Sequence, residues 1–330
     1  MNHKRTAAIL AFAVTTVCSL GLPAAGRISS LDLGTLGGQS SHANAINSAG
    51  QIVGSSGTAS GVLDAFLWQD GMMTALGTFG GNTTLASDIN RRGQIVGRSR
   101  TAAGAFHAFL WRDGMMTDLG TLGGLQSVAN CVNDHTQIAG MAQTASGQHH
   151  ATLWEHGSVS DLGTLGGIAS EALGLNNVGQ VVGFSSTGVP GDGTHAVLWE
   201  HGVVQDLGTL GGIVSEAVDI NERGQVVGFS LTETGDRHAF LWQDGTMIDL
   251  GTLGGEHSIA FAINNLGDVV GSSEVANGET HAFLWKDGVM IDLGTLGGNY
   301  SAAGDITESG EIVGEGNTIS NETHAILWTR

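Results

Sequence analysis

The chain has 330 residues, 12 Lys or Arg against 31 Asp or Glu, and a formal net charge of −19. Hydrophobic residues make up 41%, which is too many for a disordered chain. Because such an acidic surface repels phosphate backbones, nucleic acid is not an expected partner.

Residues 1–26 differ from the rest of the chain. A basic start (MNHKR) is followed by an apolar run and by small residues at Ala24-Ala25-Gly26. This is the layout of a secretory signal peptide, and we expect cleavage before Arg27. A retained membrane anchor is the alternative, although the apolar run is short for a span. No later segment is apolar enough to span a membrane, so we expect a secreted or periplasmic protein.

The remaining chain is built from seven repeats. The phrase LGTLGG, or LGTFGG in the second copy, recurs every 43 residues with one step of 45, starting at Leu33, Leu76, Leu119, Leu162, Leu207, Leu250 and Leu293. A second phrase of the HAFLW type keeps the same spacing. A period of this length indicates a solenoid, a propeller or an array.

Each repeat contains four candidate strands. In the fifth repeat they fall at 215–221, 224–230, 238–242 and 246–250, where Val, Ile, Phe and Trp are frequent. Asn221 to Gly224 and Asp244-Gly245 carry the residues of tight turns. Four strands joined by short turns in about 43 residues have the dimensions of one propeller blade.

The two ends of the chain complete each other. The C-terminal repeat stops after its third strand, HAILWTR, and the stretch RISSLDLG at 27–34 reads as a fourth strand without a repeat before it. A ring closed by the two ends leaves no exposed sheet edge. We therefore predict an all-β fold with a single domain over 27–330. The predicted domain is a seven-bladed β-propeller of four-stranded blades, in which the N-terminal strand (about 27–33) joins the three C-terminal strands.

These phrases resemble the HAF-repeat family of exported bacterial proteins, which is named for the His-Ala-Phe found here at 107–109, 238–240 and 281–283. The resemblance covers nearly all of residues 31–330. It implies export and a β-propeller-like repeat, and it implies no particular activity. The WD dipeptide of WD-type repeats is absent.

The glycine phrase joins the fourth strand of one blade to the first strand of the next. Paired glycines such as Gly37-Gly38 allow a turn in which a Cβ would clash, and we expect them to let adjacent blades approach closely. Phosphate binding is a weak alternative, because no helix follows the loop and no lysine is near it.

Two recurring side chains are interpreted as structural. Six histidines begin the third strands, and we expect each to hydrogen-bond a backbone group of a glycine loop: His107, His150, His195, His238, His281 and His324. Asp64 takes this position in the first blade. The histidines lie too far apart around a ring to bind one metal ion. Seven tryptophans are expected to pack the blades rather than to bind sugars: Trp68, Trp111, Trp154, Trp199, Trp242, Trp285 and Trp328.

Function is sought where the repeats differ. The loop between the second and third strands varies most, and the fourth copy carries a two-residue insertion with Pro190 and Asp192. Such loops are the usual place for recognition, although unconstrained drift explains them as well. The first strands place His42, Glu171 and Glu216 after a serine that recurs in most blades, so these three are also candidate ligand-binding residues.

Three carboxylates, Asp88, Asp219 and Asp305, occupy one repeat position on the first strands. Facing a channel, they would suit a hard cation such as calcium, and solvated side chains are the alternative. No other cofactor is indicated. Cys131, the only cysteine after residue 26, lies in a first strand and is interpreted as a buried inert thiol.

No catalytic motif is present. We expect an exported non-enzymatic propeller that binds an extracellular glycan or protein through its loop face. A structural envelope or matrix component is one alternative. A propeller lyase or hydrolase acting on an extracellular polymer is the other.

Overall fold

Each repeat folds into four antiparallel strands for reasons that blade five illustrates. Its strands are β18 (Gly211–Ile220), β19 (Val226–Thr232), β20 (Arg237–Gln243) and β21 (Thr246–Asp249). The hairpin between β20 and β21 has φ values of 51° at Asp244 and 79° at Gly245, as a two-residue type I′ turn requires. The Ala-Phe-Leu run of β20 is buried throughout, because neighbouring blades cover both faces of the sheet.

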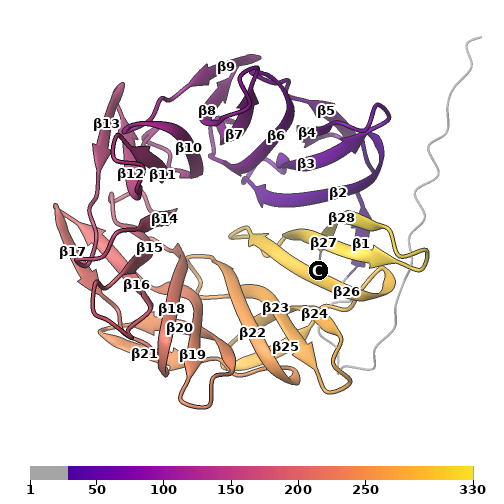
Figure 1. Cartoon of the computed structure of the whole chain (residues 1–330). Coiled ribbons are helices and arrows are strands. Elements are labelled where there is room, and N and C mark those ends of the chain that lie inside the picture. Colours follow the sequence, from indigo (N-terminus) through magenta and orange to yellow (C-terminus); the bar gives the residue numbers. More distant parts are fainter. Residues whose placement is uncertain (1–28, 330) are drawn as a thin grey trace, which may run out of the picture.

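The computed structural model describes residues 29–329, and these form 28 strands and no helix. Figure 1 shows the strands arranged as blades around a central axis. The predicted signal peptide, residues 1–26, lies outside the described residues. Within them, no helical segment has the length and hydropathy needed to cross a membrane.

The blades repeat one strand order from the axis outward. The first strands are β2 (Gly37–Ile46), β6 (Gly80–Ile89), β10 (Gly123–Val132), β14 (Ser170–Leu175), β18, β22 (Gly254–Ile263) and β26 (Gly297–Ile306). The second strands are β3 (Ile52–Thr58), β7 (Ile95–Thr101), β11 (Ile138–Thr144), β15 (Val181–Ser186), β19, β23 (Val269–Val275) and β27 (Ile312–Thr318).

The third and fourth strands form the outer part of each blade. The third strands are β4 (Leu63–Gln69), β8 (Phe106–Arg112), β12 (His149–Glu155), β16 (Thr194–Glu200), β20, β24 (Thr280–Lys286) and β28 (Thr323–Thr329). The fourth strands are β5 (Met72–Ala75), β9 (Met115–Asp118), β13 (Ser158–Asp161), β17 (Val203–Asp206), β21, β25 (Val289–Asp292) and β1 (Ser29–Asp32).

The N-terminal strand completes the seventh blade. β1 pairs antiparallel with β28, with Leu31 opposite Leu327, and the blade runs β1-β28-β27-β26. The sequence prediction of seven four-stranded blades closed by the two ends is confirmed, and the closing strand starts at Ser29 in the described residues. Figure 1 shows β1 beside β28 at the junction of the indigo and yellow ends of the chain.

The hydrophobic core lies between blades rather than at one centre. Each of seven apolar clusters takes residues from two adjacent blades. One of them joins Val313 and Ala325 of blade seven to Ile52 and Phe66 of blade one. The ring is therefore closed by packing as well as by strand pairing.

Strand direction defines two faces of the ring. Because the four strands of a blade are antiparallel, the glycine loops and the loops between second and third strands share one face, called here the glycine-loop face. The turns after the first strands, which begin with Asn in six blades, share the other with the Asp-Gly-type hairpins. This second face is called the Asn-turn face.

The second glycine of each pair lies against a strand of its own blade, and not against the adjacent blade as expected. Gly37 and Gly38 begin β2 instead of ending a loop, and a Cβ on Gly38 would lie 2.5 Å from the carbonyl carbon of Gly57. Gly57 belongs to β3 of the same blade, and the other six repeats show the same arrangement. The expectation that the second glycine serves contact between blades is wrong: it lets the first and second strands of one blade approach.

Candidate functional site

The recurring histidines bind carboxylates. In six blades, Nδ1 of the histidine lies 2.6 to 2.8 Å from Oδ2 of the aspartate that ends the fourth strand. The pairs are His107–Asp118, His150–Asp161, His195–Asp206, His238–Asp249, His281–Asp292 and His324–Asp32. The expected backbone partner was wrong. The aspartate's Oδ1 instead accepts the N–H of the glycine two residues on, as Asp206 does from Gly208 at 2.8 Å.

Blade one lacks this pair at both positions. Asp64 replaces the histidine, and Ala75 replaces the aspartate of the fourth strand. Within residues 29–329, Oδ1 of Asp64 is buried without a hydrogen-bond partner, and burial raises the pKa of this carboxyl. An aspartate at position 75 would face this carboxylate, so the two replacements compensate each other.

The seven tryptophans lie in the clusters between blades. Trp154, Trp199 and Trp328 are 2–4% exposed, and the other four pack against the same clusters from their edges. Their positions fit the structural role expected for them.

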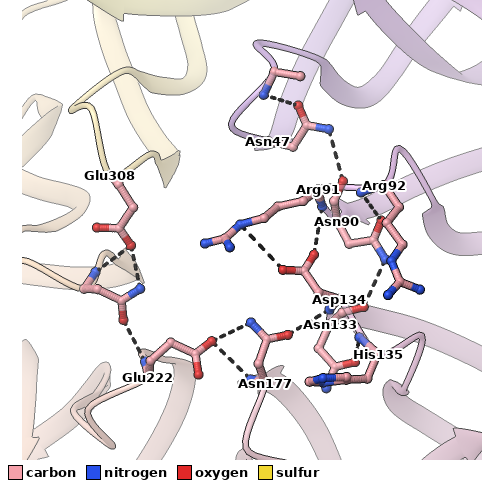
Figure 2. A network of polar contacts seen from close by, with 12 residues as sticks. Asn47, Asn90, Arg91, Arg92, Asn133, Asp134, His135, Asn177, Glu222 and Glu308 are labelled. Atoms are coloured by element: carbon pink, nitrogen blue, oxygen red, sulfur yellow. Dashed lines mark hydrogen bonds and ion pairs between the residues drawn. The ribbon is translucent and has the colours of Figure 1, made fainter.

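The Asn-turn face is held by bonds that run from blade to blade. Asn90 accepts the N–H groups of Arg92 and Gln94 through Oδ1, and its Nδ2 donates to the carbonyl of Asn133 in the next blade at 3.0 Å. A second chain links Arg91, Asp134, Asn177, Glu222, Asn265 and Glu308. Figure 2 shows this network around the end of the ring axis.

A cavity of about 240 Å³ opens inside this network. Asp134, Glu222, Asp305 and Glu308 line it together with Arg91. Asp134, Glu222 and Glu308 accept backbone N–H groups of the preceding blade. Their carboxylates therefore have a structural role in joining adjacent blades.

The three inner aspartates each join two blades. Asp88 accepts the N–H of Ile89 at 2.7 Å and that of Val132 in the next blade at 2.7 Å. Asp219 and Asp305 make the equivalent bonds. Burial raises the pKa of Asp88 to about 6 and raises those of Asp219 and Asp305.

The predicted calcium site is not assembled as a set of ligands. Among residues 29–329, no three His, Cys, Asp or Glu side chains converge on a point that would hold a metal ion. Calcium binding by Asp88, Asp219 and Asp305 stays a prediction. Cys131 is buried in β10, where the charges of Asp88 and Asp219 act on it. Burial raises the pKa of its thiol well above the ordinary value.

His42 lies at the closing interface of the ring. Its Nδ1 bonds Oε2 of Glu315 in β27, and Oε1 of Glu315 accepts the hydroxyl of Tyr300 at 2.7 Å. The bond with Glu315 raises the pKa of His42. Burial alone would raise the pKa of Glu315, but the bonds from His42 and Tyr300 outweigh it and lower the pKa.

Glu171 and Glu216 come from adjacent blades, four and five. Burial raises the pKa of Glu216, the charge of Glu171 raises it further, and Arg237 opposes both effects. Glu171 accepts Nδ2 of Asn130 at 2.9 Å. The structure thus brings Glu171 and Glu216 within electrostatic range of each other, whereas His42 sits on blade one and pairs with Glu315.

Blade four breaks the symmetry of the glycine-loop face. Its first strand, β14, has 6 residues, whereas β10 and β18 beside it have 10. The inserted loop, residues 187–193, contains Pro190 and Asp192, and Asp192 lies 3.2 Å from Nε2 of His195. The loop also lies against blade five, because a Cβ on Gly193 would be 2.2 Å from the carbonyl oxygen of Ile213.

Apolar side chains are exposed around this loop. The residue after the glycine pair is aliphatic in blades three, four and five, and Leu125, Ile168 and Ile213 are 73%, 70% and 56% exposed. The same position holds Gln39, Asn82, Glu256 and Asn299 in the other blades. Val189 in the inserted loop is 57% exposed. We call Leu125, Ile168, Ile213 and Val189 the apolar arc.

The sequence interpretation reached the inserted loop but missed the arc. The signal was present, because three consecutive repeats share aliphatic residues where the others have polar ones. The pattern is easily masked, because the position directly follows a glycine phrase that is explained by architecture.

No protein-family model matches the chain, and no curated protein sequence matches it either. Solved structures do. The WD40 β-propeller domain of Doa1 is 14% identical with a TM-score of 0.52, over 91% of this chain and 97% of that one. The β-propeller domain of the Trilobed protease from Pyrococcus furiosus, which has an open velcro topology, is 13% identical with a TM-score of 0.54, over 76% and 80%.

A puromycin-hydrolyzing peptidase from Mycobacterium tuberculosis is 13% identical with a TM-score of 0.56, over 84% of this chain. This chain spans only 48% of the peptidase. At these identities the likeness extends to the fold alone, so the chain is a β-propeller. The pairing of β1 with β28 distinguishes it from the open topology of the Trilobed protease domain.

Proposed function

We propose that this chain is an exported, non-enzymatic β-propeller of the HAF-repeat type that binds a protein partner through the glycine-loop face of blades three to five. The apolar arc carries this proposal. Solvent-exposed aliphatic side chains that gather on one side of a rigid scaffold are typical of an interaction surface.

A protein partner fits the arc better than a glycan does. Sugars are bound in large part by exposed aromatic rings, and the tryptophans of this chain lie in the clusters between blades. Leu125, Ile168 and Ile213 offer aliphatic surface, which complements aliphatic side chains of a peptide. The irregular glycine loop before the shortened β14 adds main-chain groups outside any strand.

Panning of a phage-displayed random peptide library on the immobilised protein tests the proposal. We expect enrichment of peptides whose binding is lost in a triple variant L125S/I168S/I213S. The matched control is V178S/L266S, which replaces exposed aliphatic residues of the Asn-turn face and is expected to keep binding. Thermal unfolding of each variant checks that the fold is intact.

A loop graft provides a second variant. Residues 186–194 are replaced by 274–280, the shorter loop of blade six, which removes Val189, Pro190 and Asp192 together. Loss of enrichment with unchanged thermal unfolding supports the proposal. Absence of enriched peptides, or binding that survives both the graft and the triple variant, contradicts it; self-association of the protein alone would then favour a structural component.

One observation favours an enzymatic function as a second candidate. Glu171 and Glu216 are two interacting carboxylates in adjacent blades, and the raised pKa of Glu216 is a property of general acids. A lyase or hydrolase would show activity on soluble polysaccharides that E171Q/E216Q abolishes. Activity that survives this change and His42→Ala removes the assignment.

A further inference from the structure

Positive charge is concentrated in blade two. Five of the 12 Lys and Arg residues of the chain fall between residues 76 and 118: Arg91, Arg92, Arg98, Arg100 and Arg112. Three of them belong to the Asn-turn face, where Arg91 lies 3.5 Å from Asp134 and Arg112 lies 3.9 Å from Asp113. The other two, Arg98 and Arg100, lie in β7, whose C-terminal end reaches the glycine-loop face.

Arg98 and Arg100 share one aromatic ring. Their guanidinium carbons lie 5.2 Å and 5.1 Å from the centroid of Phe106, the first residue of β8. At these distances the ring attracts each cation and holds it in place. Two like charges are thus kept close together, in a protein with 31 acidic residues.

These two arginines lack a carboxylate partner within the described part of the chain. No Asp or Glu oxygen of residues 29–329 lies within 4.0 Å of either guanidinium. Arg100 donates Nε–H to the carbonyl of Gly104 at 3.1 Å, and no protein hydrogen bond to the Arg98 guanidinium is found among the same residues. Each guanidinium has five N–H donors, so most of these donors are free for a ligand.

The pair borders the apolar arc. Ala108 in β8 donates its N–H to Oγ of Ser127 in β10 at 2.9 Å, which sets the start of β8 against the first half of β10. Phe106 lies two residues before Ala108, and Leu125 lies two residues before Ser127. Blade two therefore presents its cations next to the first member of the arc.

We propose that the glycine-loop face binds an acidic peptide segment, with carboxylates on Arg98 and Arg100 and aliphatic side chains on Leu125, Ile168 and Ile213. This inference rests on the proposed function and names the chemistry of the partner. Guanidinium groups match carboxylates in planar, bidentate pairs.

The charge of the whole chain strengthens this assignment. With a net charge of −19, the protein repels an acidic segment over most of its surface. Blade two holds two cations side by side at this face, and Arg237 of blade five is a further cation at the start of β20, so the positions of these charges fix where the carboxylates of the segment lie. An acidic glycan would satisfy the arginines but would leave the aliphatic arc exposed to water.

Fluorescence anisotropy tests the proposal with a defined probe. The probe is a labelled peptide of about ten residues in which Asp and Glu alternate with Leu and Ile. We expect R98Q/R100Q to weaken its binding at least about tenfold, because two charge-assisted contacts are lost. The control R92Q/R112Q removes two charges from the Asn-turn face of the same blade and is expected to leave binding unchanged.

Three further measurements test which chemical groups of the peptide are recognised. Raising NaCl from about 0.05 M to about 0.5 M is expected to weaken binding to the wild type and to change binding to R98Q/R100Q much less. A probe with Gln and Asn in place of the acids, and one with Ser in place of the aliphatic residues, are both expected to bind at least about tenfold more weakly.

The outcomes separate this inference from the proposed function. Equal binding of the amide probe, unchanged binding by R98Q/R100Q, or preference for polyuronate over the peptide overturns the acidic-peptide assignment. If neutral peptides from the library still bind in an arc-dependent way, the proposed function stands and only the acidic assignment falls. No detectable binding of the acidic probe to the wild type also overturns it.

Discussion

His324 in the last strand and Asp32 in the first make the same His–Asp hydrogen bond that joins residues eleven apart in five other blades. Nδ1 of His324 lies 2.6 Å from Oδ2 of Asp32, across 292 residues of sequence. Asp32 also accepts the N–H of Gly34 at 2.8 Å. Within the closing blade, β1 and β28 are thus joined by the same contacts that join the third and fourth strands of the other blades.

Removing residues 27–33 from a chain that begins at Arg27 is expected to expose the edge of β28 and to promote self-association. Light scattering after gel filtration measures this. The control Asp32→Ala loses the hydrogen bond with His324 but keeps the strand, so it is expected to keep the oligomeric state of the unmodified protein. A deleted chain whose oligomeric state and unfolding temperature are both unchanged contradicts closure by β1.

Restoring the missing pair in blade one is expected to stabilise the protein. D64H/A75D recreates the His–Asp pair and gives the N–H of Gly77 a carboxylate acceptor, with a gain of about 0.5–1 kcal/mol in the free energy of unfolding. A75D alone sets two carboxylates together and is expected to destabilise. Calorimetry of the two single variants and the double variant gives the coupling; additive effects refute it.

Gly38→Ala is expected to destabilise by about 1–3 kcal/mol, because the new Cβ meets the backbone of Gly57 at 2.5 Å. Gly57→Ala is the matched control, since its Cβ would find its nearest neighbour at 3.6 Å, an ordinary contact. Urea unfolding measures both. Equal effects of the two substitutions would show that the close approach of β2 and β3 is not needed.

Stability is expected to fall as pH rises from about 4 to about 6. Burial raises the pKa of Asp88 to about 6, against about 3.9 in an unfolded chain, so the native state holds more protons in this window. The rise corresponds to about 3 kcal/mol. Asp219 and Asp305 act in the same direction.

Asp88→Asn is expected to reduce the slope of unfolding free energy against pH over this window. The absolute stability of the variant is not the readout, because Asn accepts one fewer backbone N–H than the carboxylate does. Urea titrations at several pH values give the slope. A slope equal to that of the wild type contradicts the raised pKa of Asp88.

Most of the fold could be predicted because it depends on local patterns. The 43-residue period, the turn residues and the partial repeats at both ends define the blades and their closure without distant contacts. The aspartate partner of the recurring histidine could also have been inferred. The aspartate at the position of Asp118 is missing from one blade only, and the histidine is missing from that same blade. The neighbour of Gly38 could not, because it depends on the register of β2 against β3.

The candidate site was only partly predictable. Pro190 and Asp192 stand out as an insertion, and Arg98 and Arg100 stand out once charges are counted by repeat. The contact of both arginines with the ring of Phe106 could not be predicted from the sequence, because it depends on how side chains of β7 and β8 are placed relative to one another. The shortening of β14 likewise follows from how the inserted loop packs against Gly166 and Ile213.

Hydrogen–deuterium exchange of the protein with and without the acidic aliphatic probe tests the central claim most directly. We predict slower exchange at 98–106, 123–127, 166–170, 187–193 and 211–215, which belong to the glycine-loop face of blades two to five. Protection confined to 90–94 and 133–137 on the Asn-turn face, or no protection at all, would contradict it.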